Sequence, residues 1–170
     1  MDTLLARCAA GDKDAFAALY DQYANLVYKT AVLALETQQD AEDALQEVFL
    51  KVYRGLHTYD PVRGAFTTWL YRVTLNHCMA KRRRRSVTVT PLDGQTLSTP
   101  PAARGLATID QLRRVLNQLD DRQREVVILR YYWDLPYREI AAVLEIPLGT
   151  VQSRLSRALQ TMKHIMEVQQ

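Results

Sequence analysis

One segment near the C-terminus concentrates side chains that can hydrogen-bond to nucleic-acid bases. Residues 148–166, LGTVQSRLSRALQTMKHIM, place apolar side chains at helical spacing along one face. The opposite face carries these polar side chains: Thr150, Gln152, Ser153, Arg154, Ser156, Arg157 and Gln160. Arginine can bond to guanine edges and glutamine to adenine edges, whereas serine and threonine suit bases or phosphates. Because the first turns of a recognition helix enter the major groove, this face predicts binding to double-stranded DNA.

A shorter helix is expected just before that segment. Residues 136–144, PYREIAAVL, begin with a proline, which a first helical turn accepts, and continue with a buried stripe made by Ile140, Ala141 and Leu144. The tripeptide at 145–147, EIP, interrupts the pattern. Two helices with so short a break predict a helix-turn-helix. The same pattern also fits an ordinary helical hairpin with a solvated polar face.

A second group of side chains, in residues 66–85, combines aromatic rings with cations. The segment FTTWLYRVTLNHCMAKRRRR ends in five consecutive basic residues, which repel one another unless a polyanion is present. One helical face has the pattern of a core: Phe66, Trp69, Leu70, Val73, His77 and Ala80. Another face has these residues: Arg72, Asn76, Met79 and Arg83. Cations beside aromatic rings suit single-stranded nucleic acid, although Trp69 alone fits a core better than a stacking role.

An acidic helix is expected over residues 39–56. Its apolar stripe contains Ala41, Ala44, Leu45, Val48, Phe49, Val52, Tyr53 and Leu56. Leu50 lies away from that stripe and is surrounded by Gln46, Glu47 and Arg54. A leucine framed by polar and charged groups has the anatomy of a protein-docking anchor, and its carboxylates would repel DNA. A plain solvated helix face is the alternative.

These segments must be positioned by two helical blocks. Apolar periodicity predicts helices over roughly 2–10, 12–35, 39–56, 67–84, 108–118, 121–132, 136–144 and 148–166. Between the fourth and fifth helices, residues 86–107 hold three of the six prolines and two glycines, a composition typical of a flexible linker. The expected fold is therefore all-α, with blocks at 1–85 and 108–170.

Composition excludes several other classes of protein. A net charge of +3 is too small to imply nucleic acid by itself. Cys8 and Cys78 form no CxxC motif and no histidine cluster accompanies them, so we expect neither a metal site nor a disulfide scaffold. No apolar leader and no run of 18 apolar residues is present, which favours a cytoplasmic protein. No nucleophile–base pair or phosphate loop indicates an enzyme, and no cofactor is expected.

Together, three segments resemble one family. In order they are DAEDALQEVFLKVYRGLHTYD, RGAFTTWLYRVTLNHCMAKRRRR and LPYREIAAVLEIPLGTVQSRLSRAL. They are similar to the bacterial RNA polymerase sigma factors of the extracytoplasmic function (ECF) group, over about 140 of the 170 residues and around a variable linker. The resemblance implies a region-two domain at 1–85, a linker at 86–107 and a region-four domain at 108–170.

The resemblance also implies a role for each group of residues. The polymerase clamp would contact Asp43, Gln46, Glu47 and Leu50. The loop from Tyr59 to Phe66 would capture one flipped base of the −10 promoter element. The residues that would open and bind this element are Arg63, Phe66, Trp69, Arg72, Asn76, Lys81, Arg82 and Arg83. The rest of the basic run, to Arg85, would approach the duplex. The −35 element would be bound by Arg122, Arg124, Thr150, Gln152, Ser153, Arg154 and Arg157.

Three positions depart from the family pattern. Asp120 stands where proline is common, Pro136 where a capping Ser or Thr is usual, and Gln152 where Arg is frequent.

The implied partners are core RNA polymerase, through its clamp and flap, promoter DNA, and a separate anti-sigma factor. No membrane insertion and no small-molecule substrate are implied. A free-standing, dimeric helix-turn-helix regulator is the alternative, but it explains only residues 108–170, and a protein that merely sequesters polymerase would not need the DNA-binding segments.

Overall fold

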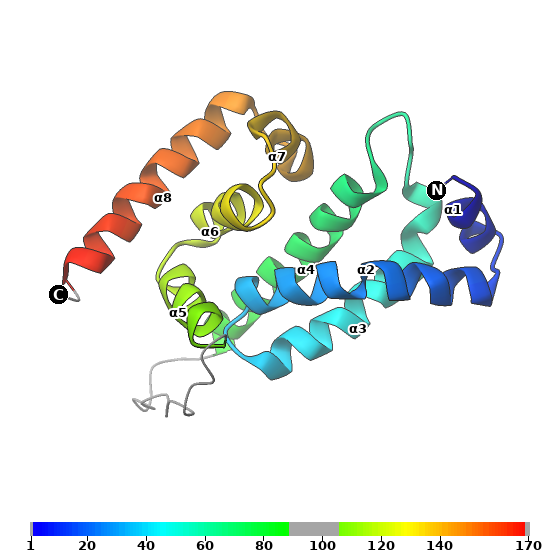
Figure 1. The fold of residues 1–170 in the computed structure, drawn as a ribbon, viewed down its shortest axis with the longest axis horizontal. Helices are drawn as coiled ribbons and strands as arrows, with labels where there is room; N and C mark the ends of the chain where they lie inside the picture. The colour runs from blue at the N-terminus through cyan, green and yellow to red at the C-terminus, as the bar shows by residue number, and fades with distance from the viewer. Residues whose placement is uncertain (1, 89–105, 169–170) are drawn as a thin grey trace.

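A computed structural model describes residues 2–88 and 106–168, and every regular element in those two ranges is helical (Figure 1). The first range contains α1 (Asp2–Ala9), α2 (Lys13–Ala34), α3 (Gln38–Gly55), the 3-10 turn η1 (Leu56–Thr58) and α4 (Phe66–Thr88). The second contains α5 (Leu106–Asn117), α6 (Asp121–Val127), the π-helical turn η2 (Ile128–Tyr132), α7 (Tyr137–Leu144) and α8 (Leu148–Val168). The all-α fold class is thereby confirmed. We call the two ranges the N-terminal and C-terminal halves.

Short polar side chains determine where several helices begin. The Asp12 carboxylate accepts hydrogen bonds from the Asp14 and Ala15 amides, each at 3.0 Å, and so caps α2. Thr37 caps α3 by accepting from the Asp40 amide at 3.0 Å. Asp120, the residue that departs from the family's proline, caps α6 by accepting from the Gln123 amide at 2.8 Å. Pro136 precedes α7 and supplies no side-chain cap.

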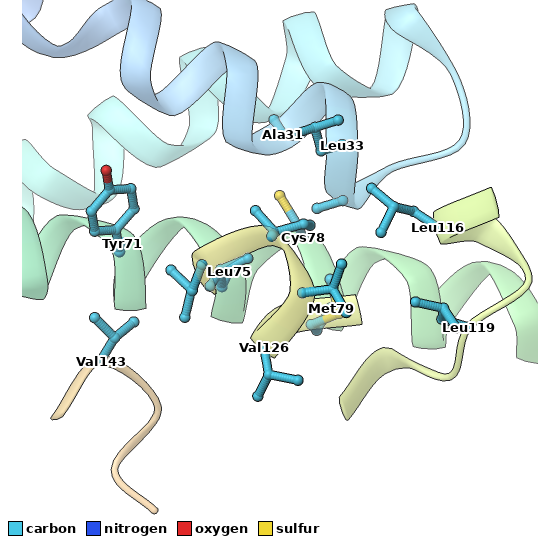
Figure 2. Close-up of a cluster of buried hydrophobic side chains, with 14 of the residues drawn as sticks. Ala31, Leu33, Tyr71, Leu75, Cys78, Met79, Leu116, Leu119, Val126 and Val143 are labelled. Atoms are coloured by element: carbon cyan, nitrogen blue, oxygen red, sulfur yellow. The ribbon is translucent and has the colours of Figure 1, made fainter. Parts of the chain in front are cut away.

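Helix α4 lies at the centre of the molecule, between α2 and α3 on one side and the C-terminal half on the other (Figure 1). One core cluster belongs to the N-terminal half and includes Leu19, Val48 and Phe66. A second cluster runs through both halves: Figure 2 shows side chains of α2 and α4 meeting those of α5, α6 and α7. The two halves therefore share a continuous apolar core.

This shared core corrects the predicted faces of α4. Met79, which the sequence pattern placed with Arg72 on a face other than the core face, is buried, as are Leu75 and Cys78. The reason is that the C-terminal half packs on that side of the helix, which periodicity within one segment does not reveal.

The predicted linker at 86–107 is shorter than expected where the structure describes it. Helix α4 continues through residues 86–88, and α5 already begins at Leu106. No glycine or proline occurs between Arg85 and Pro91, so nothing in the sequence stops the helix at 85. Residues 89–105, the rest of the predicted linker, lie outside the described residues.

Candidate protein and nucleic-acid interfaces

The outer face of α3 presents the four residues predicted to bind a protein, which we call the α3 surface: Asp43, Gln46, Glu47 and Leu50. Leu50 is 54% exposed, as predicted, and the neighbouring Tyr53 is 53% exposed although the pattern placed it on the apolar stripe. The Tyr53 ring still contacts Phe16 edge-on, with ring centroids 5.1 Å apart. The α3 surface, together with the adjoining Tyr53, thus combines two exposed apolar side chains with a rim of carboxylates, as protein-docking patches do.

A pocket of about 230 Å³ opens where the loop before α4 meets the first turns of that helix. Most of its lining comes from the N-terminal half, including Tyr59, Arg63, Trp69 and Arg72. Trp69 is half-buried and packs against Phe66 and Tyr59, with ring centroids 5.6 and 6.1 Å away. The pocket therefore offers aromatic faces for stacking and guanidinium groups for phosphate, which is the combination that single-stranded DNA needs. We call it the aromatic pocket.

Backbone and side-chain hydrogen bonds fix the loop that borders the aromatic pocket. The Asp60 carboxylate accepts from the Val62 amide at 2.9 Å, and the Tyr59 hydroxyl donates to the Gly64 carbonyl at 3.2 Å. Gly64 has φ of +150°, a conformation that side chains rarely adopt. Val62, at the tip, is 92% exposed. The loop is preorganised, which reduces the entropy lost when a ligand enters.

Phe66 and His77 do not reach the surface. Phe66 is buried between Tyr23, Tyr59 and Trp69, so its ring supports the aromatic pocket from behind and does not face a ligand. His77 is buried as well, and its Nδ1 lies 2.9 Å from Lys51 Nζ. Burial, followed by the charge of Lys51, lowers the pKa of His77.

Carboxylates of the same chain pair with much of the basic run at 81–85. Lys81 Nζ lies 3.3 Å from Asp40 and 3.5 Å from Asp43, and Arg85 also pairs with Asp40. Arg82 reaches Glu36 at 3.3 Å and Asp121 at 3.0 Å. Intramolecular ion pairs therefore relieve much of the repulsion within the basic run, for which the sequence analysis had invoked a polyanion. Arg82, with its side chain 16% exposed, links the two halves and leaves little surface for DNA.

The helix-turn-helix has the predicted form. Ile140 and Val143 of α7 are buried where α7 packs on α4 and α8, and Val151, Leu155 and Ala158 of α8 are buried where α8 packs on α6 and α7. Ala141 and Leu144, predicted to share the buried stripe with Ile140, are only half-buried. Figure 1 shows α8 running along the edge of the molecule farthest from α1. Its outer face bears the predicted DNA-reading side chains, with Gln152, Ser153 and Arg157 exposed and Thr150 and Arg154 half-buried.

Arg124 does not belong to a DNA-binding surface, contrary to its predicted role. Its side chain is fully buried, and its guanidinium donates to the carbonyls of Leu116 and Leu119 at 2.8 and 2.9 Å. Asp121 pairs with it at 3.3 Å, and burial lowers its pKa to about 10. Arg124 therefore joins the end of α5 to α6, whereas Arg122, two residues earlier, is exposed.

The residues predicted to bind the two promoter elements face one another across a second cleft of about 240 Å³. From α4 come Arg72, Asn76 and Arg83, and from the C-terminal half come Arg122 and Arg154. Glu125 lines the same cleft, 3.9 Å from Arg154, and burial raises the pKa of its carboxyl to about 7.

Two residues that sequence reasoning missed also join the halves. Glu145, in the turn between α7 and α8, lines the aromatic pocket and forms an ion pair with Arg72. Trp133 donates from its indole N–H to Thr30 Oγ1 at 3.0 Å, and its ring packs at a tilt against Tyr71. A glutamate at a helix C-terminus where glycine is favoured was the available signal for Glu145. No local signal marked Trp133.

In 2–88 and 106–168 no three His, Cys, Asp or Glu side chains are grouped so that they could hold a metal ion. None of the helices in those ranges has the length and apolarity required to cross a bilayer.

Comparison with known proteins identifies two matching family models and several relatives. The models are "Sigma-70 region 2", over residues 19–88, and "Sigma-70, region 4", over residues 109–162. The chain is 30% identical to the ECF RNA polymerase sigma factor SigW of Bacillus subtilis, covering 90% of this chain and 89% of that protein. It is 31% identical to the ECF RNA polymerase sigma factor SigK of Mycobacterium tuberculosis, covering 99% and 94%.

Two solved structures have the same fold. One is CnrH in complex with the cytosolic domain of CnrY, with a TM-score of 0.75 and 23% identity over 99% of this chain and 97% of that one. The other is the sigma factor RpoE of Bartonella quintana in complex with the anti-sigma factor NepR, with a TM-score of 0.73 and 22% identity over 91% and 98%.

Proposed function

Because the chain belongs to the sigma-70 family, as an ECF RNA polymerase sigma factor, we propose that its three surfaces divide the work of starting transcription. The α3 surface binds core polymerase, the aromatic pocket binds the −10 element, and the outer face of α8 binds the −35 element. The protein performs no bond chemistry itself and works where bacterial polymerase is found, in the cytoplasm. The observation that carries this proposal is the presence of both region models, in order, on halves that each present an exposed binding surface.

The α3 surface suits a protein better than DNA. Its exposed Leu50 supplies apolar area, and the carboxylates of Asp43 and Glu47 would repel phosphates while accepting hydrogen bonds from basic residues of a partner. We assign its partner as the polymerase clamp, and the helix-turn-helix half as the partner of the flap.

The aromatic pocket suits an unstacked base. Trp69 and Tyr59 provide ring faces, Arg63 and Arg72 provide cations, and the rigid loop closes one side. Extruding a base from a duplex costs a few kcal/mol, which stacking and phosphate contacts must supply. Phe66 contributes indirectly, by supporting Tyr59 and Trp69.

The −35 role rests on α8. Gln152, Ser153 and Arg157 are exposed on one face near its N-terminus, with Thr150 and Arg154 beside them. Arg122 adds a cation from α6, and Arg124 is withdrawn from this set because it is buried. A glutamine at 152 favours adenine at the base that it contacts.

The decisive experiment is initiation in vitro. Core polymerase is incubated with the full chain and genomic DNA, and the transcripts are sequenced. A sigma factor yields transcripts with defined starts that share two upstream elements, whereas a free-standing regulator yields none above the level of core enzyme alone. The aligned start sites also test the assignment of Gln152.

The double variant Glu47→Gln, Leu50→Ala tests the α3 surface. We expect it to lose capture by core polymerase at least tenfold, because removing a central anchor and its charged neighbour typically costs 2 kcal/mol or more. Both side chains are more than half exposed, so its melting temperature should match that of the wild type. Glu42→Gln, an exposed carboxylate elsewhere on α3, is the control and should bind normally. Normal capture of the double variant would contradict the docking assignment.

A further inference from the structure

A buried ionisable side chain, His77 of α4, lies beneath the α3 surface. Its ring is only 1% exposed. The Nδ1 atom lies 2.9 Å from Lys51 Nζ, and the Nε2 atom lies 3.7 Å from Glu47 Oε2. Lys51 follows Glu47 by one helical turn, so both side chains project from the same face of α3. His77 therefore contacts, from inside the molecule, two charged side chains that a docking partner would meet from outside.

The contact with Lys51 determines which ring nitrogen of His77 carries the proton. An ammonium group can only donate, so Nδ1 must accept, and the neutral ring then bears its proton on Nε2, facing Glu47. A protonated ring would oppose one donor and cation to another. Burial and the charge of Lys51, followed by those of Lys81 and Arg84, hold the pKa of His77 below its ordinary value, against the opposing charge of Glu47.

The Nε2 atom of His77 gives the Glu47 side chain a preferred place to lie. Within residues 2–88 and 106–168 it is the only buried side-chain nitrogen or oxygen without a hydrogen-bond partner. The Glu47 side chain is 53% exposed and 3.7 Å away, so a small rotation brings its carboxylate within bonding distance. Because a buried donor without an acceptor is costly, the ring favours those rotamers of Glu47 that approach Nε2.

Helix α4 holds the neighbouring carboxylate of the α3 surface as well. Lys81, one turn after His77, lies 3.5 Å from Asp43, which precedes Glu47 by one turn. Asp43, Glu47 and Lys51 thus form a row of charges along α3, and each of them has a partner on α4. Side chains that are already oriented lose less entropy when a partner binds.

We propose that His77 is a positioning residue for polymerase binding, which orients the Glu47 carboxylate and the Lys51 ammonium beside the exposed Leu50. His77 itself does not touch the partner. This inference rests on the proposed function, because it assigns His77 to the surface that is proposed to bind polymerase.

The test measures the affinity of the full chain for core polymerase with three different side chains at position 77. His77→Leu removes both ring nitrogens and keeps an apolar side chain in the core, whereas His77→Gln keeps one acceptor for Lys51 and one donor for Glu47. Thr74→Val is the matched control, since it removes a buried hydroxyl of α4 that donates to the Leu70 carbonyl of the same helix at 2.8 Å. Urea denaturation of every variant is measured in parallel.

We expect His77→Leu to bind polymerase about fivefold more weakly than the wild type, because Glu47 and Lys51 lose their shared partner. Its resistance to urea should be equal or higher, because an unpaired buried polar atom is removed. His77→Gln and Thr74→Val should bind within about twofold of the wild type. In a Glu47→Ala background, His77→Leu should cost less than about twofold, since the carboxylate that it positions is then absent.

Normal binding by His77→Leu would overturn the inference, and so would a loss that parallels a loss of stability or that His77→Gln fully shares. Nitrogen NMR of the free wild-type chain examines the ring without any substitution at that site, with the His77 signals assigned by their absence from His77→Gln. The proton should reside on Nε2 at neutral pH, and a proton on Nδ1 would overturn the inference. Failure of the wild-type chain to bind polymerase would instead contradict the proposed function, and is distinguished because it requires no substitution.

Discussion

The α3 surface and the DNA-facing residues differ in how much of them is open to a partner. Leu50 is 54% exposed and nothing from the C-terminal half covers it, whereas the Arg72 and Arg154 side chains are 25% and 20% exposed and lie in clefts between the halves. Leu50 is therefore open to a partner in this arrangement, whereas Arg72 and Arg154 are partly covered. The difference teaches that the proposed polymerase surface depends on one half alone, whereas the proposed DNA-facing cations also depend on how the two halves pack.

The largest effect is expected where a residue predicted to face DNA is in fact structural. Arg124→Ala should lower the free energy of unfolding by about 3 kcal/mol, because the Leu116 and Leu119 carbonyls and Asp121 lose a buried cationic partner. Urea denaturation measures this change in the free energy of unfolding. Arg157→Ala, on the exposed face of α8, should change stability by less than about 0.5 kcal/mol and instead weaken DNA binding. A stable Arg124→Ala protein would return this residue to the DNA-binding set.

A second prediction compares the carboxyl of Glu125, in the second cleft, with that of Glu42, on the exposed side of α3. Burial raises the pKa of Glu125 to about 7 from its ordinary value of 4.5, so the folded chain binds this proton more tightly than the unfolded chain. The contribution of Glu125 to the free energy of unfolding is therefore fully present below about pH 4.5 and is lost as pH rises to about 7. Glu125→Gln should therefore raise the free energy of unfolding at pH 8 by about 2 kcal/mol and flatten this part of the pH profile.

Glu42→Gln, on exposed α3, is the matched control for Glu125→Gln and should leave the profile unchanged. If polymerase separates the halves, Glu125 becomes hydrated and its pKa returns toward the ordinary value. If the free energy of unfolding of Glu125→Gln depended on pH as that of the wild type does, water would have to reach the second cleft freely. The contrast between covered and open surfaces would then be weaker.

The smallest effect is expected from Trp133→Phe. The change removes the hydrogen bond to Thr30 while keeping an aromatic ring beside Tyr71, and we expect it to lower the free energy of unfolding by about 1 kcal/mol. Binding to core polymerase should be unaffected, because Trp133 is remote from the α3 surface. Tyr131→Phe, at an exposed neighbouring position, should be neutral in the same denaturation measurement. A loss of polymerase binding in Trp133→Phe would show that the two surfaces are coupled.

Features that depend on local pattern were predictable from the sequence. Apolar periodicity placed most helix ends within two residues, and it correctly singled out Leu50 as an exposed leucine. The break at 145–147 identified the helix-turn-helix because a short turn must interrupt a single apolar stripe there. The resemblance to sigma factors was confirmed by the family models.

Features that depend on packing between distant segments were not predictable. Met79 was placed off the core face because the half that buries it lies beyond residue 105. Arg124 looked like a DNA-binding cation, since nothing in its own helix shows that two carbonyls around residues 116–119 bind it. Nor did the sequence show that Arg82, predicted to contact DNA, pairs with Glu36 and Asp121 in this arrangement.

The two tryptophans of this chain stand at the places where its halves meet: Trp69 lines the aromatic pocket and Trp133 is half-buried against Thr30 and Tyr71. Indole emission shifts to longer wavelength when water replaces a protein neighbour. Separation of the halves therefore has an intrinsic optical signal, and Trp69→Phe leaves Trp133 as its sole source. Stopped-flow mixing with unlabelled polymerase would show whether the halves separate on binding, without any dye attached to this chain.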